Sequence, residues 1–483
     1  MISKFKTIDF YQSKSAYNLL PYRFLSLDSQ RYIVTNLAGE YIILSLDELQ
    51  RFTRKQLTYD DSIYNELKSK HFLYDDESDI ALELLAVKYR TKQSYVANFT
   101  GLHIFVVTLR CDHSCPYCQV SRQSEDKMSF DMTREIADKG IEILFKSPSS
   151  TLKVEFQGGE SLLNFELIKY IVEQVETKNI TFGKYIKFVI ATNLSPLNNE
   201  ILEYCFHRNI YISTSLDGSE KLHNTNRPKQ GNDSYAKSVA GIERVRQKLG
   251  QNSVSALMTT THESLKYPRE IIDEYLRLGF KSIFLRSISP YGFAVKTVNS
   301  TGYDMNEWLD FYKEALAYII ELNQAGVKFV EEYTALVLKK ILTPYPTGYV
   351  DLQSPAGIGI SVIIFNYNGE VYASDEARML AEMNDKTFKL GNLLTDSYEQ
   401  IFTSDILIET IYETMLEGVP RCTDCAFIPY CGSDPVYHHA TQNDKVGYKL
   451  TSDFCHKNMS IIKHIIKLME TQPDIKTILE SWL

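Results

Sequence analysis

Three cysteines lie close together in the stretch CDHSCPYC, which runs from Cys111 to Cys118. The thiols of Cys111, Cys115 and Cys118 have the spacing CxxxCxxC. Zinc usually takes four ligands, often from two CxxC pairs, so three close thiols leave its shell incomplete. A [4Fe–4S] cluster held by three thiolates keeps one iron open, and that iron can bind a substrate. The spacing therefore indicates an iron–sulfur centre with one free coordination position.

A second group of cysteines lies near the end of the sequence, at Cys422, Cys425, Cys431 and, after a gap, Cys455. Four thiolates at this spacing can close either a structural zinc site or a fully ligated [4Fe–4S] cluster, and the residues alone leave both open. The remaining cysteine, Cys205, falls on an expected helix, where a small buried apolar side chain is the usual interpretation.

Composition limits the possible partners and the compartment. The net charge of −9 and the absence of a large basic block argue against a nucleic-acid partner. The N-terminal residues contain no apolar segment typical of a signal peptide, and no apolar run approaches the length of a membrane span. We therefore expect a cytoplasmic protein, in which clustered cysteines bind metal rather than form disulfides.

Short apolar runs alternate with amphipathic segments from residue 103 onward. Strands are expected at 103–109, 152–157, 185–192, 209–215, 253–259 and 281–287. Helices are expected near 131–146, 163–178, 197–207, 234–249, 264–278 and 304–325. Six such repeats predict an α/β fold with a parallel sheet, arranged as a partial (β/α)6 TIM-like barrel. Active groups should then lie at the C-terminal ends of the strands.

The segments on either side of this core have a different pattern. Residues 22–44 predict three short strands, and Ser45 with Glu48 predicts a capping box that begins a helix. We expect a small winged-helix-like α+β domain over residues 1–97, a core over 98–330 and a C-terminal extension over 331–483. The extension contains a hairpin with its turn at Asn368 and Gly369. The first domain could bind an extended peptide along a strand edge, or could only pack against the core.

The CxxxCxxC motif, with Tyr117 before its last cysteine and its place after the first strand, resembles that of the radical S-adenosylmethionine (SAM) enzymes. The resemblance implies that the open iron binds the methionine moiety of SAM. It further implies that one electron from the cluster cleaves SAM, and that the resulting 5′-deoxyadenosyl radical removes a hydrogen atom from the substrate.

The polar residues at the other strand ends support the same resemblance. Gly158-Gly159-Glu160 is similar to the family's GGE element, and the run from Ser215 to Arg227 is similar to its SLDG…HN..R element. The resemblance implies that Glu160 meets the amino group of SAM, Ser215 the ribose and Arg227 the carboxylate. The full set of implied SAM-binding residues is Gly158, Gly159, Glu160, Thr192, Asn193, Ser215, Asp217 and Arg227.

The second cysteine group resembles the SPASM extension of peptide-modifying members, which has seven cysteines and two auxiliary clusters. Three of the seven positions hold Ser354, Ser374 and Pro435. In the family these three serve the auxiliary cluster nearer the active site. We therefore expect one auxiliary [4Fe–4S] cluster in addition to the SAM cluster, with either a redox or a purely structural role. The acids Asp375 and Asp434 could fill the vacated space and act as a general base, or be solvated surface carboxylates.

Nearly the whole chain is similar to one narrower family, the His-Xaa-Ser system radical SAM maturase HxsB. The shared stretches include LLPYRF, NLAGEYIILS, CDHSCPYCQVSRQSED, KVEFQGGESLLNF, SDEARMLAEM and CGSDPVYHHATQND. The resemblance implies a ribosomally made precursor peptide as substrate, a second radical SAM maturase of the HxsC type as partner, and a flavodoxin- or ferredoxin-type electron donor.

The expected function is hydrogen abstraction from the precursor peptide, followed by bond formation within it. Formylglycine formation on a protein, as in sulfatase maturases, is one alternative. A non-catalytic partner that binds peptide for a second enzyme is another, and a radical enzyme acting on a small molecule is a third. The intact Cys111, Cys115, Cys118 and Glu160 argue against the non-catalytic alternative.

Overall fold

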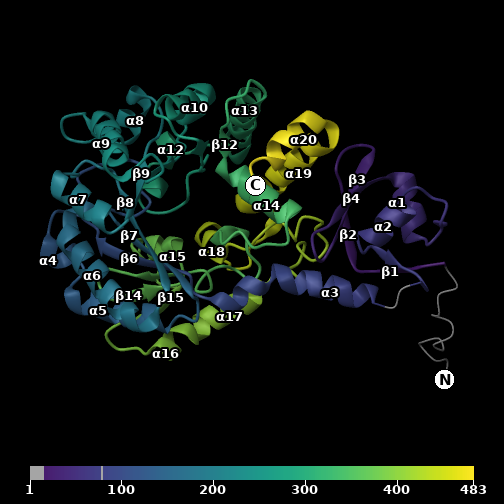
Figure 1. Cartoon of the computed structure of the whole chain (residues 1–483), viewed down its shortest axis with the longest axis horizontal. Coiled ribbons are helices and arrows are strands. Elements are labelled where there is room, and N and C mark those ends of the chain that lie inside the picture. The colour runs from purple at the N-terminus through teal and green to yellow at the C-terminus, as the bar shows by residue number, and fades with distance from the viewer. Residues whose placement is uncertain (1–15, 78–79) are drawn as a thin grey trace.

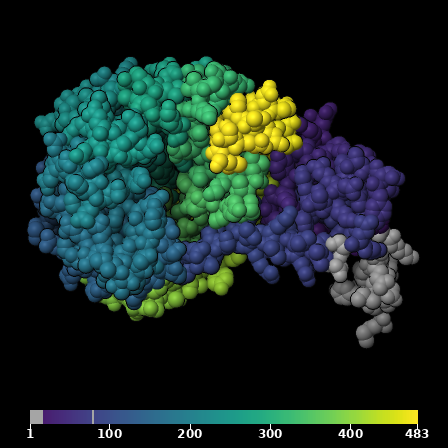
Figure 2. Space-filling view, in the orientation of Figure 1, coloured from purple at the N-terminus to yellow at the C-terminus, as the bar shows by residue number. Residues whose placement is uncertain are grey.

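The computed structural model describes residues 16–77 and 80–483. The chain forms a large α/β part, a small N-terminal part and a C-terminal part that contacts both (Figure 1). Figure 2 shows one face of the molecule hollowed between the blue-green residues of the α/β part and the green segments that follow them. The predicted absence of a signal peptide falls mainly on residues 1–15, outside the described residues.

An eight-stranded sheet forms the centre of the α/β part, in the order β10-β9-β8-β7-β6-β13-β14-β15. Neighbouring strands from β6 to β10 are parallel. These strands carry many apolar residues because helices cover both faces of a parallel sheet of this kind. The predicted α/β fold with a parallel sheet is confirmed. The five parallel strands are β6 (Leu102–Thr108), β7 (Thr151–Gly158), β8 (Tyr185–Thr192), β9 (Tyr211–Ser215) and β10 (Val254–Leu257).

The sixth expected strand, at 281–287, differs from the prediction. Only β11 (Ser282–Ile283) forms, and it pairs with β12 (Val330–Glu331) rather than with β10. The buried carboxylate of Glu331 accepts a hydrogen bond from the backbone N–H of Leu285 at 3.2 Å. A side chain therefore satisfies a backbone donor that a neighbouring strand would otherwise satisfy. As a result the barrel is open between β10 and β11.

The predicted hairpin forms, and it joins the central sheet. β13 (Val362–Phe365) and β14 (Glu370–Tyr372) are antiparallel, with Gly369 in the turn at a φ of +84°. β15 (Lys389–Asn392) pairs with β14. β13 lies parallel to β6, with Val362 opposite Leu102. The hairpin of the C-terminal extension thus continues the sheet that carries the cysteine loop.

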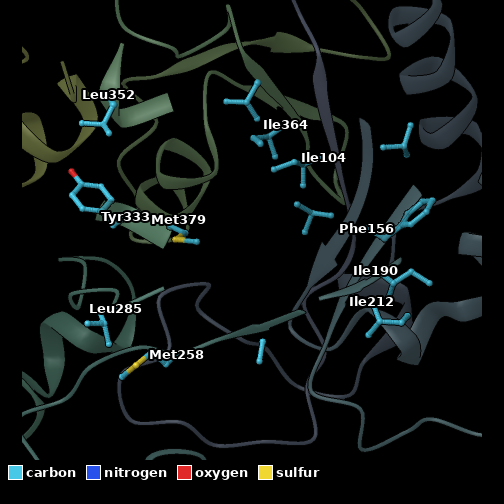
Figure 3. Packing of buried hydrophobic residues seen from close by; sticks show 14 of the residues in the cluster. Ile104, Phe156, Ile190, Ile212, Met258, Leu285, Tyr333, Leu352, Ile364 and Met379 are labelled. Carbon is cyan, nitrogen blue, oxygen red and sulfur yellow. The ribbon is translucent and has the colours of Figure 1, made fainter. Parts of the chain in front are cut away.

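Helices cover the sheet and bury a continuous apolar core. Figure 3 shows Ile104, Phe156, Ile190 and Ile212 extending from neighbouring strands into this core, and each is at most 3% exposed. Side-chain caps begin several of the helices, as Thr133 does for α5. The covering helices are α5 (Arg134–Lys146), α6 (Phe165–Phe182), α7 (Asn199–His207), α9 (Ser234–Leu249), α10 (Pro268–Arg277) and α13 (Met305–Gln324).

The N-terminal part has its own sheet and its own core. β2 (Tyr22–Ser26), β3 (Arg31–Asn36) and β4 (Tyr41–Ser45) are antiparallel in that order. The predicted capping box is present, because Ser45 and Glu48 each bind the other's backbone N–H at the start of α1. The remaining elements are α1 (Leu46–Thr53), α2 (Tyr64–Ser69) and the pair β1 (Asn18–Leu19) with β5 (Leu73–Tyr74).

Helix α3 (Ala81–Lys92) runs from the N-terminal part to the rest of the molecule (Figure 1). The N-terminal sheet also contacts the second cysteine region directly, through Thr35 Oγ1 donating to the carbonyl of Ala426 at 2.7 Å. Tyr430 Oη donates to the carbonyl of Gly39 at 2.8 Å. The division at residues 97 and 330 stays a prediction.

The remaining helices are short or belong to the C-terminal part. None of the helices in residues 16–77 and 80–483 is both long enough and apolar enough to cross a bilayer. These helices are α4 (Lys127–Phe130), α8 (Glu220–Asn226), α11 (Phe293–Lys296), α12 (Val298–Thr301), α14 (Glu332–Leu342), α15 (Asp375–Ala381), α16 (Tyr398–Phe402), α17 (Asp405–Glu413), α18 (Pro435–Gln442), α19 (Asp453–Thr471) and α20 (Pro473–Glu480).

Candidate active site

The loop with the first three cysteines follows β6 and is held from several sides. At its start, Arg110 forms a bidentate ion pair with Asp131, at 2.7 and 2.8 Å. At its end, the carbonyl of Cys118 accepts a hydrogen bond from the N–H of Phe293 at 2.8 Å. A Cβ on Gly292 would lie 2.5 Å from that same carbonyl. The segment after β11 therefore packs directly against the cysteine loop, which the sequence alone did not indicate.

A cavity of about 230 Å³ opens at the C-terminal ends of the parallel strands, where the fold predicts the active groups. All three cysteines of the first group line this cavity. Six of the eight implied SAM-binding residues line it as well. These nine residues are Cys111, Cys115, Cys118, Gly158, Gly159, Thr192, Asn193, Ser215 and Arg227.

The two glycines after β7 allow two loops to pack backbone against backbone. A Cβ on Gly158 would lie 2.1 Å from the carbonyl oxygen of Thr108. A Cβ on Gly159 would lie 2.4 Å from the carbonyl oxygen of Arg110. Real Cβ contacts are never this short, so any larger residue must displace the cysteine loop. The glycines are required here for close approach of the chain.

Glu160 lies behind the cavity wall and is 1% exposed. One carboxylate oxygen accepts hydrogen bonds from Leu162 N at 2.9 Å and Thr192 Oγ1 at 2.6 Å, and the other accepts from Asn193 N at 2.7 Å. Burial raises the pKa of Glu160 to about 7 despite these bonds. Glu160 thus positions two residues that line the cavity, and its contact with SAM stays a prediction.

Asp217 also lies behind the cavity wall, fully buried, and it holds a charged residue in place. Its carboxylate accepts hydrogen bonds from Arg227 at 3.1 and 3.2 Å and from Tyr117 Oη at 2.5 Å. The guanidinium of Arg227 stacks over the Tyr117 ring, 5.5 Å from its centroid. The SLDG segment therefore fixes the arginine and the aromatic residue of the cysteine motif together. Direct binding of SAM by Asp217 or Arg227 stays a prediction.

Two buried histidines connect the cysteine loop to the same region. His113 and His223 both contact the hydroxyl of Ser234, at 2.8 and 3.0 Å. His113 also hydrogen bonds to Asp112 at 2.8 Å and to Asn193 at 2.9 Å. Sequence reasoning did not single out His113 or Ser234, although the histidine lies within the cysteine motif.

The cysteine geometry tests which metal centre the loop fits. In a tetrahedral zinc site the sulfur atoms lie about 3.8 Å apart, from a Zn–S distance of about 2.3 Å. Within the described part of the chain, the only three metal-ligating side chains with atoms within 4.8 Å of one another are Cys111, Asp112 and His113. The sulfur atoms of Cys111, Cys115 and Cys118 are thus spread more widely than one zinc ion allows. They fit a centre with several metal atoms.

The four C-terminal cysteines give the same result. Cys422, Cys425, Cys431 and Cys455 line one cavity of about 520 Å³. Cys455 lies in the first turn of α19. Ser452 caps that helix, because its Oγ accepts a hydrogen bond from the backbone N–H of Cys455 at 3.2 Å. No three of these four sulfur atoms, all in the described region, lie within 4.8 Å of one another. The spacing fits a cluster better than zinc.

The residues at the three missing cysteine positions have ordinary structural roles. Ser354 Oγ donates to Glu417 at 2.9 Å. Ser374 caps α15 by accepting from the N–H of Ala377 at 3.2 Å. Pro435 is in the first turn of α18, where its missing N–H costs nothing.

The two acids proposed as general bases lie in different pockets. Asp375 lines the active-site cavity and accepts a hydrogen bond from Arg378 at 2.8 Å. Asp434 lines a separate, smaller pocket together with Asp351 and Glu376. Sequence reasoning missed these last two acids, although Glu376 directly follows Asp375.

Comparison with known proteins agrees with this geometry. The sequence model of the Radical SAM superfamily matches residues 105–275. An uncharacterised protein of Methanocaldococcus jannaschii is 28% identical over 39% of this chain. The radical SAM cyclopropyl synthase TigE of Paramaledivibacter caminithermalis is 25% identical over 45%. This chain spans only 62% of the first relative's length and 48% of the second's.

A longer alignment links the chain to the cysteine-type anaerobic sulfatase-maturating enzyme of Clostridium novyi. The two are 21% identical over 75% of this chain and 94% of that enzyme. Native anSMEcpe with bound AdoMet has a similar structure, with a TM-score of 0.65 and 15% identity over 79% of this chain and 99% of that one. Streptococcus suis SuiB bound to its precursor peptide SuiA gives a TM-score of 0.52 and 13% identity over 91% and 99%.

The fold, the cavity with its three cysteines and the family model that matches residues 105–275 indicate the class of radical SAM enzymes for this part of the chain. A sulfatase-maturating enzyme and a subtilosin biosynthesis protein, AlbA of Bacillus subtilis, are among the proteins that the chain is similar to. The class implies a [4Fe–4S] cluster and SAM as cofactors.

Proposed function

We propose that this protein is a peptide maturase that uses SAM to remove a hydrogen atom from a ribosomally made precursor peptide. The observation that carries the proposal is the convergence of Cys111, Cys115 and Cys118 with six implied SAM-binding residues on one cavity. A precursor peptide is named as the bound partner in the SuiB structure, and this supports the choice of a peptide substrate.

Each group of residues has a distinct role in this proposal. Cys111, Cys115 and Cys118 would hold the cluster, which with SAM supplies a hydrogen-abstracting radical when both are bound. Gly158 and Gly159 present backbone to the cavity where side chains would block it. The buried Asp217 keeps Arg227 oriented toward the cavity. The loop after β11 covers the cysteine loop and limits access of water to the reacting groups.

The N-terminal part offers a groove for the peptide. β4 pairs with β3 alone among the described strands, so no strand covers its other edge. There Lys70 Nζ donates to the carbonyl of Tyr41 at 3.0 Å, a contact that an added strand would replace. A cavity of about 830 Å³ runs along that edge, between β4 and α3. Ile43 of β4 and Val87 of α3 line it, with Lys88 also present. An extended peptide could add to the sheet there by backbone hydrogen bonds.

The C-terminal cysteines would hold one auxiliary [4Fe–4S] cluster, as the wide spacing of their sulfur atoms supports. A His-Xaa-Ser precursor, a second maturase of the HxsC type and a flavodoxin- or ferredoxin-type donor rest on the sequence resemblance. Formylglycine formation is the second candidate, because the relative from Clostridium novyi is named a sulfatase-maturating enzyme.

Loss of the first cysteine group tests the proposed chemistry. Replacing Cys111, Cys115 and Cys118 by Ala should abolish formation of 5′-deoxyadenosine from SAM by the anaerobically reconstituted enzyme, since no other thiols line the cavity among the described residues. Cys205→Ala is the matched control, because this buried thiol lies on α7, away from both groups. SAM cleavage by the triple variant would reject the assignment.

A second test addresses the groove. Ile43→Asp should weaken binding of the precursor peptide at least tenfold, because a charge replaces an apolar contact in the groove. Phe24→Asp is the control, because Phe24 is 48% exposed on β2, at the opposite edge of the sheet. Equal affinity of the Ile43→Asp variant and the control would remove the groove from the proposal.

Mass spectrometry identifies the reaction and the substrate. Small peptides encoded beside the gene are co-expressed with the enzyme and with the triple cysteine variant. A mass loss of two hydrogens on a precursor supports bond formation, and conversion of a cysteine or serine to formylglycine supports the second candidate. An unchanged peptide pool contradicts peptide maturation.

A further inference from the structure

A small polar pocket adjoins the active-site cavity. It has a volume of about 50 Å³, and Arg286 lines both this pocket and the cavity with the three cysteines. Three carboxylates line it, from Asp351, Glu376 and Asp434, together with Lys457 of α19. Space of this size holds a charged group of only a few atoms, since a single water needs about 10–15 Å³ by a comparable measure.

The three acids come from the segments in which the family's cysteines are missing. Asp351 lies three residues before Ser354, Glu376 two residues after Ser374, and Asp434 directly before Pro435. The three positions at which the resemblance lacks a cysteine thus lie within three residues of carboxylates that line one pocket.

Tyr291 gives independent evidence that the pocket has an occupant. The residue is 1% exposed and lines the pocket. Its hydroxyl finds no hydrogen-bond partner within the described part of the chain. After burial, the charges of Asp434, Glu376 and Asp351 are the main causes that raise the pKa of Tyr291, and all three acids line the same pocket. A buried hydroxyl without a partner is costly, and a ligand in the pocket would satisfy it.

The charges of the pocket do not balance. Three carboxylates face two cations, Arg286 and Lys457. The closest ion pair, Arg286 with Glu376, has its atoms 3.7 Å apart. Lys457 has no carboxylate within 4.0 Å among the described residues. Burial and the neighbouring acids raise the pKa of Glu376 to about 7 and raise that of Asp434 well above its usual value, so these acids favour bound protons when the pocket is empty.

Aromatic side chains form the rest of the wall. Tyr333, Tyr437 and Trp308 line the pocket beside the acids. Aromatic faces attract cations through their quadrupoles, and carboxylates attract them through charge. Lys457 already lies over the Tyr333 ring, 5.8 Å from its centroid. A pocket that combines aromatic faces with three carboxylates is complementary to a cation.

We propose that this pocket binds one protonated side chain of the substrate peptide, an ammonium, guanidinium or imidazolium group, and so orients the peptide beside SAM. The proposal rests on the proposed function, because it requires a peptide substrate. Glu376 and Asp434 pair with the cation, and Tyr291 accepts a hydrogen bond from it. The bound cation takes the place of protons that Glu376 and Asp434 bind when the pocket is empty.

The test uses the precursor that mass spectrometry identifies, synthesised with each Lys, Arg and His replaced singly by Gln. Wild-type holoenzyme should lose about tenfold in kcat/KM with one of these Gln peptides, the size expected for a charged hydrogen bond. The enzyme variant Glu376→Gln/Asp434→Asn should lose about as much with the parent peptide. We call the Gln peptide that lowers the kcat/KM of the wild type the critical Gln peptide. The enzyme variant should show no further loss in kcat/KM with this peptide, because the interaction is already absent.

Tyr291→Phe keeps the volume of the side chain and should lose about threefold with the parent peptide but less with the critical Gln peptide. Glu399→Gln/Asp405→Asn, two exposed acids on α16 and α17, is the matched control and should not differ from wild type. Iron content and thermal unfolding of each variant check its folding.

Three outcomes overturn the proposal. In the first, the losses in kcat/KM from the Glu376→Gln/Asp434→Asn variant and from the Gln peptide are additive when the two changes are combined. Additive losses show that the acids and the peptide cation do not interact. Equal activity of the wild type on every Gln peptide, or a precursor without any cationic residue, shows that no cation is recognised. A fall in kcat alone for the Glu376→Gln/Asp434→Asn variant, equal for all peptides, assigns the acids a proton-transfer role. A wild type that modifies no peptide fails the proposed function itself, which is a separate result.

Discussion

At the scale of single residues, the active site depends on groups that do not themselves line the cavity. Glu160 and Asp217 are buried behind its wall, where they accept hydrogen bonds from residues that do line it. Gly158 and Gly159 have no Cβ, and this lets the backbone of the cysteine loop pack directly against them. The buried acids and the glycines of these motifs therefore position the residues that line the cavity.

Gly159→Ala should disturb the cysteine loop, because the new Cβ would lie 2.4 Å from the carbonyl oxygen of Arg110. Overpacking of this kind usually costs about 1–3 kcal/mol. We expect a lower thermal unfolding midpoint and weaker SAM binding. Gly101→Ala is the control, because its Cβ would have its nearest neighbour at 4.0 Å. Equal effects of the two substitutions would contradict the close-approach argument.

Asp217→Ala should be more damaging than a typical core substitution. It leaves the guanidinium of Arg227, 13% exposed, without its carboxylate partner. An uncompensated buried charge costs about 3–5 kcal/mol. Thermal unfolding at a fixed scan rate measures the loss, and Asp217→Ala combined with Arg227→Met should recover part of it. Failure of the double variant to recover stability would mean that the charge is not the cause.

At the scale of elements, helix α3 joins the N-terminal part to the C-terminal part. Lys92 at its end is half-buried, and its ammonium donates to the carbonyl of Lys340 at the C-terminal end of α14 at 2.8 Å. It also lies over the Tyr430 ring, 5.5 Å from the centroid. These contacts fix the helix, and with it one wall of the groove proposed for the peptide, against the region of the second cysteine group.

The ionisation of Lys92 makes the stability of this contact depend on pH. Burial lowers its pKa to about 8 from a usual value of 10.5. Between these values the unfolded state binds more protons than the native state, so the free energy of opening rises with pH there. Hydrogen exchange of α3, corrected for its intrinsic pH dependence, should show this rise from pH 8 to 10. Lys92→Met should reduce it, and an equal rise in the variant would contradict the assignment.

At the scale of the whole molecule, the C-terminal part contacts both other parts. β13 extends the sheet that carries the first cysteine loop, and the carbonyl of Ala426, beside Cys425, accepts a hydrogen bond from the N-terminal sheet. The second cysteine group therefore lies where three parts of the chain meet. A cluster there would stabilise the arrangement whether or not it also transfers electrons.

Metal analysis tests how many clusters the molecule holds. Two cubane clusters correspond to about eight iron atoms per chain after anaerobic reconstitution, and Cys425→Ser should reduce this to about four. Cys205→Ala should leave the count unchanged, because its thiol is buried on α7. About twelve irons would contradict the loss of one auxiliary cluster. About four irons with one zinc would make the C-terminal site a zinc site.

The sequence by itself determined the local features of this protein. Apolar periodicity identified five of the strands and most of the covering helices, because burial on both faces imposes it. Short motifs identified the cysteine ligands and the capping box at Ser45, since those depend on spacing of a few residues. The sixth strand was predicted too long, because a distant residue, Glu331, binds its backbone.

Only the tertiary structure decided which distant residues share a pocket. Asp351, Glu376 and Asp434 are separated by as many as 83 positions in the chain, and no local pattern brings them together or joins them to Tyr291. The same holds for the groove beside β4, which residues of α3 and of the end of α14 also line. Local periodicity reports which face of an element is buried, whereas pockets depend on contacts between elements whose geometry the whole core sets.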